Sequence, residues 1–104
     1  MAKAGVYEAV FFNARKRQSA QFDSTGKWLQ TENETDFNQL PRPVSQALNK
    51  QFSGFQIQEA YQVETVDKGT LYDVSVFKGK ENYEVTFSAK GEVLSKEAGK
   101  EDNE

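Results

Sequence analysis

The stretch that decides the fold is Tyr72 to Leu94, YDVSVFKGKENYEVTFSAKGEVL. Apolar and polar residues alternate along it, and two glycine-containing turns divide it into three strands. A shift of 65 residues aligns it without a gap with Tyr7 to Leu29, YEAVFFNARKRQSAQFDSTGKWL, at five identical positions of 23. The identical pairs are Tyr7 and Tyr72, Phe12 and Phe77, Phe22 and Phe87, Gly26 and Gly91, and Leu29 and Leu94. We interpret the two stretches, residues 7–29 and 72–94, as a partial internal repeat of an antiparallel meander.

A single helix is predicted between the two copies. The segment Leu40-Pro-Arg-Pro43 opens it, because proline is tolerated in the first turn of a helix. One apolar stripe recurs at helical spacing and consists of Leu40, Val44, Ala47, Leu48 and Phe52. A polar linker over residues 33–39 precedes the helix, and a strand over residues 55–66 follows it. The expected fold is α+β: an antiparallel sheet in the order βββ-α-ββββ, with the helix packed on one face.

The helix is too short to cover the whole sheet. Eleven helical residues span about 16 Å, whereas seven paired strands span about 30 Å. The second copy of the repeat is preceded by a helix and a long strand, and the first copy has no counterpart of either. We therefore expect the sheet to fold over on itself, another chain to cover it, or upstream residues to complete it.

Composition narrows the functional classes. The chain has 104 residues, no Cys and no His, which removes disulfides, thiol nucleophiles, imidazole bases and Cys/His metal sites. We expect one domain over residues 1–97, a disordered tail over 98–104, and no cofactor or metal. The net charge of −3 argues against a nucleic-acid partner. No apolar stretch has the length of a membrane-spanning helix, and residues 1–5 lack the apolar run of a signal peptide.

Five short motifs follow one another in a fixed order. They are FDSTGKW at Phe22–Trp28, Leu40-Pro41 with Val44, FSGFQIQEA at Phe52–Ala60, YDVSV at Tyr72–Val76, and TFSAKGEVL at Thr86–Leu94. In this order and spacing they resemble the PepSY-like domains found mostly in Bacteroidetes, whose fold is related to that of the β-lactamase inhibitor protein. The resemblance covers most of the chain and implies a periplasmic or secreted, non-enzymatic domain. It also implies a protein partner, of which a peptidase or another enzyme is one class, gripped by the sheet.

The candidate partner-binding residues are Phe12, Phe77, Val10, Ser75, Asp73 and Trp28. Phe12 and Phe77 stand one step out of register with the other apolar residues of their strands, so they are expected on the sheet face opposite the helix. A face that mixes aromatic and polar residues fits a protein partner. Packing of both rings under loops is the alternative, and Trp28 is either an interface anchor or a residue at the rim of the core.

Two further segments are interpreted as structural. Asp23-Ser-Thr-Gly-Lys27 lacks the extra carboxylates of a calcium loop and the spacing of a phosphate-binding loop, so it is interpreted as a turn. Arg15-Lys16-Arg17 is interpreted as a solvated hairpin. The favoured function is a non-catalytic binding module that uses the open sheet face. The alternatives are an assembly domain that closes a homodimer through that face, and a small-ligand sensor with a closed apolar cavity near Leu48 and Phe52.

Overall fold

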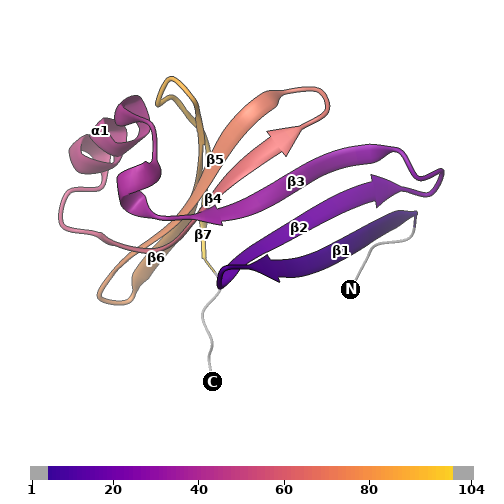
Figure 1. Cartoon of the computed structure of the whole chain (residues 1–104). Coiled ribbons are helices and arrows are strands. Elements are labelled where there is room, and N and C mark those ends of the chain that lie inside the picture. Colours follow the sequence, from indigo (N-terminus) through magenta and orange to yellow (C-terminus); the bar gives the residue numbers. More distant parts are fainter. Residues whose placement is uncertain (1–4, 100–104) are drawn as a thin grey trace.

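The computed structural model describes residues 5–99 and has one antiparallel sheet with a single α-helix (Figure 1). The strands lie side by side in chain order and are β1 Val6–Asn13, β2 Lys16–Asp23, β3 Trp28–Thr35, β4 Gln56–Thr65, β5 Gly69–Lys78, β6 Glu81–Ser88 and β7 Val93–Ala98. A 3₁₀ turn, η1 Phe37–Gln39, and the helix α1 Arg42–Gln51 connect β3 to β4. The predicted α+β order βββ-α-ββββ is therefore confirmed. Apart from Ala98, which ends β7, and Gly99, the tail predicted over 98–104 lies outside the described residues.

The polar linker predicted over residues 33–39 is wrong for its first half. Strand β3 continues to Thr35, and η1 occupies residues 37–39. Asn33 and Glu34 belong to the strand because they pair with Gln62 and Tyr61 of β4. A cross-strand ladder of this kind overrides the weak strand preference of polar residues.

The hydrophobic core lies between α1 and the second half of the sheet. The buried apolar residues of this cluster come from α1 and its flanks and from β4, β5 and β6: Leu40, Val44, Leu48, Phe52, Ala60, Tyr72, Val74, Val76, Val85 and Phe87. Phe52, Phe55 and Tyr83 stack at the rim, with ring centroids 5.7 to 6.4 Å apart. The ammonium group of Lys96 lies 4.5 Å from the Tyr83 ring centroid, so the rim is closed by cation–π contacts as well as by apolar packing.

The two meanders have the same strand pairing after a shift of 65 residues. Tyr7 lies opposite Phe22 in the first, and Tyr72 lies opposite Phe87 in the second. The register shift beside Phe22 has its counterpart beside Phe87. The turns also agree, since Asp23 N–H donates to Lys27 O and Ser88 N–H donates to Glu92 O, both at 2.9 Å.

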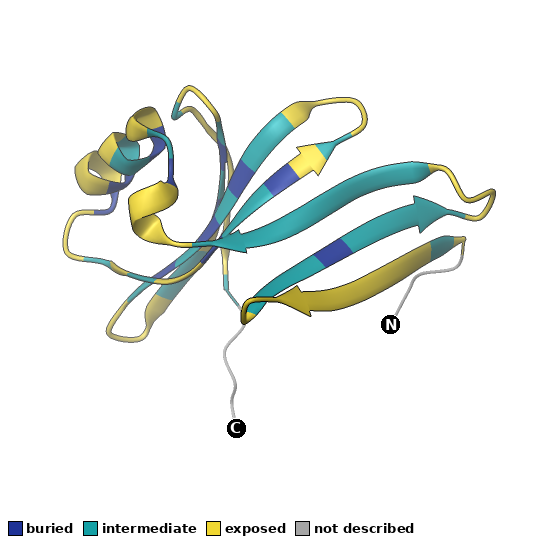
Figure 2. Cartoon of the chain, in the orientation of Figure 1, coloured by how far each residue is buried: buried dark blue, intermediate teal, exposed yellow. Residues whose placement is uncertain are grey.

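The helix covers only one of the two meanders. Figure 1 shows α1 beside β5 and β6, whereas β1 to β3 extend away from it. The exposed fraction of Tyr7 is 61%, while that of the matching Tyr72 is 8%. Figure 2 shows β1 as almost entirely exposed. The helix side of β1–β3 is therefore an uncovered apolar surface within residues 5–99.

Candidate functional site

The face of the sheet opposite α1, which we call the open face, is defined by strand alternation. Val74 of β5 is buried under α1, so its neighbours Asp73 and Ser75 point to the open face. Pairing across the sheet carries this assignment to the other strands, and it places Val10 and Phe12 of β1 on the same side. Both are exposed, Phe12 at 69%.

The predicted site residues do not form one cluster. Phe12 lies on β1 and the half-buried Phe77 lies on β5, so three strands separate them and the gap is about 19 Å. Trp28 lies on the helix side, because it pairs with Phe22 and its Nε1–H donates to Thr31 Oγ1 at 2.8 Å. The open face therefore contains all of the predicted site residues except Trp28, spread over two strands.

A charged cluster at the middle of the open face was not singled out from the sequence. The Arg17 guanidinium lies 3.9 Å from a carboxylate oxygen of Glu8 on β1 and 3.9 Å from one of Glu32 on β3. These separations are longer than a hydrogen bond, so Arg17 compensates both carboxylates only in part. Its position on strand β2, with the same parity as Ser19, is the signal that could have revealed it.

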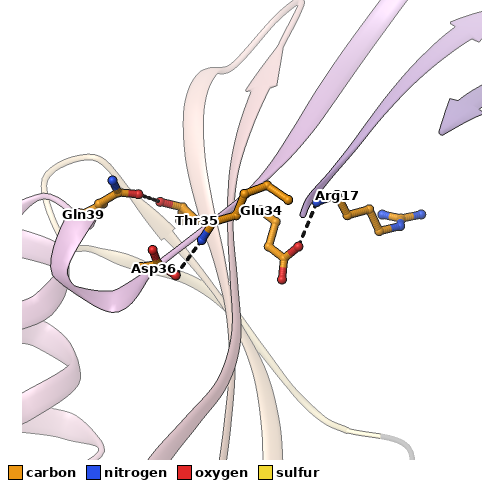
Figure 3. A network of polar contacts seen from close by, with 6 residues as sticks. Arg17, Glu34, Thr35, Asp36 and Gln39 are labelled. Carbon is orange, nitrogen blue, oxygen red and sulfur yellow. Dashed lines mark hydrogen bonds and ion pairs between the residues drawn. The ribbon is translucent and has the colours of Figure 1, made fainter. Parts of the chain in front are cut away.

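The basic hairpin that contains Arg17 is divided among three environments. Arg15 lies in the turn, with a φ of 70°. Lys16 donates to Asp36 Oδ1 at 2.6 Å on the helix side. The backbone N–H of Arg17 donates to Glu34 Oε1 at 2.8 Å, and in Figure 3 the guanidinium points away from this carboxylate. The side chain of Glu34 thus satisfies a backbone group at the point where the pairing of β2 with β3 ends.

Ser19 is a buried polar residue beneath this cluster. It lies opposite Val10 of β1 and Glu32 of β3, and its exposed fraction is 0%. Its Oγ has no hydrogen-bond partner among the described residues. A buried hydroxyl without a partner is uncommon in folded proteins and calls for a functional or energetic reason.

The open face is strongly acidic. Seven strand carboxylates share it: Glu8, Glu32, Glu34, Glu59, Asp73, Glu84 and Glu97. Arg17 is the one cation among the described strand residues of this face, because the other described Lys and Arg residues lie in turns, on α1 or on the helix side of the strands. The field above this face is therefore negative.

The carboxylates of Glu32 and Asp73 repel each other across the sheet. Burial raises the pKa of Glu32, the Asp73 charge raises it further, and Arg17 offsets only part of this effect. Asp73 Oδ1 accepts a hydrogen bond from Thr86 Oγ1 at 2.7 Å. A positive charge placed between Glu32 and Asp73 would relieve this repulsion.

Two surface hollows lie on opposite sides of the sheet. The first, of about 380 Å³, lies on the open face and is lined by Leu29, Val63, Leu71 and Asp73, among others. The second, of about 600 Å³, lies beside Leu48 and is open to solvent. It does not have the closed form that the sensor hypothesis requires.

A seven-stranded antiparallel sheet with one helix-covered face defines the β-lactamase-inhibitor-like class of fold. The sequence matches, over residues 5–95, the family described as "Putative beta-lactamase-inhibitor-like, PepSY-like". The chain therefore belongs to this PepSY-like family. No curated protein matches the sequence closely enough to count as a relative.

Solved structures from Bacteroides share the fold. A BLIP-like protein from Bacteroides fragilis has a TM-score of 0.82 and 23% identity, and the match covers 100% of this chain and 77% of that one. A protein from Bacteroides eggerthii described as "putative periplasmic" has a TM-score of 0.87 and 20% identity, with 94% and 73% covered. A DUF2874 family protein from Bacteroides ovatus has a TM-score of 0.84 and 17% identity, with 94% and 72% covered.

No helix within residues 5–99 combines the length and the apolar character needed to cross a bilayer.

Proposed function

We propose that the protein is a non-catalytic, extracytoplasmic binding module that recognises a protein partner through the open face. Inhibition of a peptidase or another enzyme is the activity that the family description suggests for it. The periplasmic location is supported by the description of the Bacteroides eggerthii structure. The observation that carries the proposal is the open face itself, which no element within residues 5–99 covers and which carries the charged cluster around Arg17.

The composition of this face suits recognition rather than folding. Phe12 is 69% exposed, which is an unfavourable position for a large ring unless a partner covers it. Ser75 and Glu84, which are joined by a weak hydrogen bond of 3.4 Å, add polar groups beside it on the same face. Interfaces combine aromatic contacts with a polar surround in this way.

The experiment is affinity capture from the envelope fraction of the source organism. The bait proteins are the wild type, a variant with Phe12→Ser and Phe77→Ser, and the control variant Tyr7→Ser. Tyr7 is a matched control because it is an exposed ring on the same strand as Phe12 but on the helix side. The double variant is expected to lose the captured protein and the control to keep it. Equal capture by all three baits would contradict the use of the open face.

An assembly domain is the second candidate, and strand β1 is the observation that favours it. Strand β1 is an edge strand, seven of its eight residues are exposed, and Glu8 is its one charged residue. An exposed apolar edge is a template for pairing with another strand. Sedimentation equilibrium of the wild type and of a Phe11→Lys variant tests this candidate, because a charge on β1 should disrupt edge pairing. A monomeric wild type at all concentrations would exclude it.

A further inference from the structure

We propose that the open face receives an arginine or lysine side chain of the partner protein, seated in the hollow between Glu32 and Asp73. This inference rests on the proposed function and deepens it, because it states the chemistry by which the partner is recognised. The hollow has a volume of about 380 Å³.

The floor of the hollow is apolar and matches the aliphatic part of such a side chain. Val63 of β4 lies opposite Glu32 on one side and opposite Leu71 on the other, and it is buried. Leu29 also lines the hollow. Long cationic side chains pack their methylene groups on surfaces of this kind while the charged end stays hydrated or paired.

The edges of the hollow provide the counter-charges. Asp73 uses Oδ1 to accept the hydrogen bond from Thr86, and Oδ2 accepts none from the described residues. Glu32 receives a weak hydrogen bond from Gln30 Nε2 at 3.4 Å, and the Arg17 guanidinium stays at 3.9 Å. Both carboxylates therefore have unused acceptor capacity, and a guanidinium can fill it with two parallel N–H donors.

The buried hydroxyl of Ser19 is an independent sign of incomplete satisfaction at this place. Ser19 lies directly opposite Glu32 on the open-face side of β2, and its Oγ has no partner in the described part of the chain. An apolar partner surface would leave this oxygen and the two carboxylates without donors. A side chain with several N–H groups supplies what the site lacks.

The overall charge of the face selects a cation and excludes an anion. Arg17 is the one cation among its described strand residues, against seven carboxylates. A partner carboxylate or phosphate would meet repulsion from most of the face. A basic segment would be attracted from a distance as well as at contact.

The test is an NMR titration of the ¹⁵N-labelled chain with the peptide acetyl-Gly-Arg-Gly-amide. Shift changes are expected at Val63, Leu71 and Asp73, with weak, salt-dependent affinity. The same peptide with norleucine in place of arginine keeps the aliphatic stem without the charge, and it should cause no localised change. Asp73→Asn should weaken binding by about fivefold. Asparagine can still accept the hydrogen bond from Thr86, so this variant is expected to fold.

The matched control is Glu64→Gln. Glu64 is the neighbour of Val63 on β4, it is exposed, and it faces the helix side. This variant removes the same charge from the chain and should bind the peptide as the wild type does. Equal weakening by both variants, or shift changes spread over the whole surface, would overturn the inference by reducing it to a general charge effect.

The outcome also separates this inference from the proposed function. Capture that depends on the open face, together with no peptide binding at Asp73, would overturn the cationic seat alone. Localised peptide binding, with capture that ignores the open-face variants, would support the seat and refute its use for the captured protein.

Discussion

The two matching glycine turns give the sharpest test of how the helix covers the sheet. Gly26 and Gly91 stand 65 residues apart, with φ values of 88° and 86°. Alanine at either position would adopt a left-handed conformation at a cost of about 1–2 kcal/mol. A Cβ at Gly26 would meet nothing within 4 Å. A Cβ at Gly91 would lie 2.8 Å from the carbonyl carbon of Pro43, and closer still to the oxygen.

The difference between the two substitutions measures the close approach of the turn to the start of α1. Pro43 lies in the first turn of the helix, so its carbonyl group moves only if the helix moves. We expect Gly91→Ala to cost about 1–3 kcal/mol more than Gly26→Ala, which is the usual penalty for overpacking a rigid site. The conformational cost is common to both variants and cancels in the comparison.

The assay is urea denaturation at neutral pH, followed by circular dichroism, for both variants and the wild type. The slope against urea should stay unchanged, so that midpoints convert directly into free energies of unfolding. Equal losses in the two variants would refute the reasoning, because they would mean that α1 does not rest on the turn between β6 and β7. A larger loss for Gly26→Ala would mean that the first meander is the covered one.

Three other expectations follow from burial and charge. Ser19→Ala should raise the free energy of unfolding by about 1 kcal/mol, since it removes a buried hydroxyl without a partner, whereas the exposed Ser95→Ala should change it by less than about 0.5 kcal/mol; destabilisation by Ser19→Ala would show that the oxygen is paired. Glu32 has a folded pKa above its ordinary value of 4.5, so its ionisation destabilises the fold as pH rises above that value; Glu32→Gln should raise Tm at pH 7 and leave it unchanged below about pH 4, as thermal scans can check. Phe87→Ala should cost about 3–5 kcal/mol, and Phe12→Ser should cost less than about 0.5 kcal/mol, in the same urea assay.

The faces of the strands could be predicted from the sequence, but their neighbours could not. Alternation alone is enough to put Phe12 and Asp73 on the same side of the sheet. The position of Trp28 depends on the register shift beside Phe22, and nothing in the sequence marks it. The extension of β3 through Glu34 likewise depends on its pairing with Tyr61, a partner 27 residues later in the chain.

The charged site needed the order of the strands as well as their faces. Glu8, Arg17 and Glu32 come from three different strands, and they meet because β1, β2 and β3 are adjacent. The burial of Ser19 arises from the side chains above it, which alternation does not describe. The sequence signal for such a site is the common parity of acidic residues on consecutive strands, once a meander has been recognised.

The separation of charge across the sheet allows one small domain to combine a stable core with a binding surface. On the helix side, Lys78 and Lys96 lie over aromatic rings at the rim of the core, so these cations contribute to packing. On the open face the carboxylates are held close together with too few cations, so they contribute little to the fold and attract a partner. A charge on the helix side should therefore affect stability, whereas a charge such as Asp73 should affect binding. This division is what a domain without Cys or His can achieve when its working surface is a sheet face rather than a catalytic pocket.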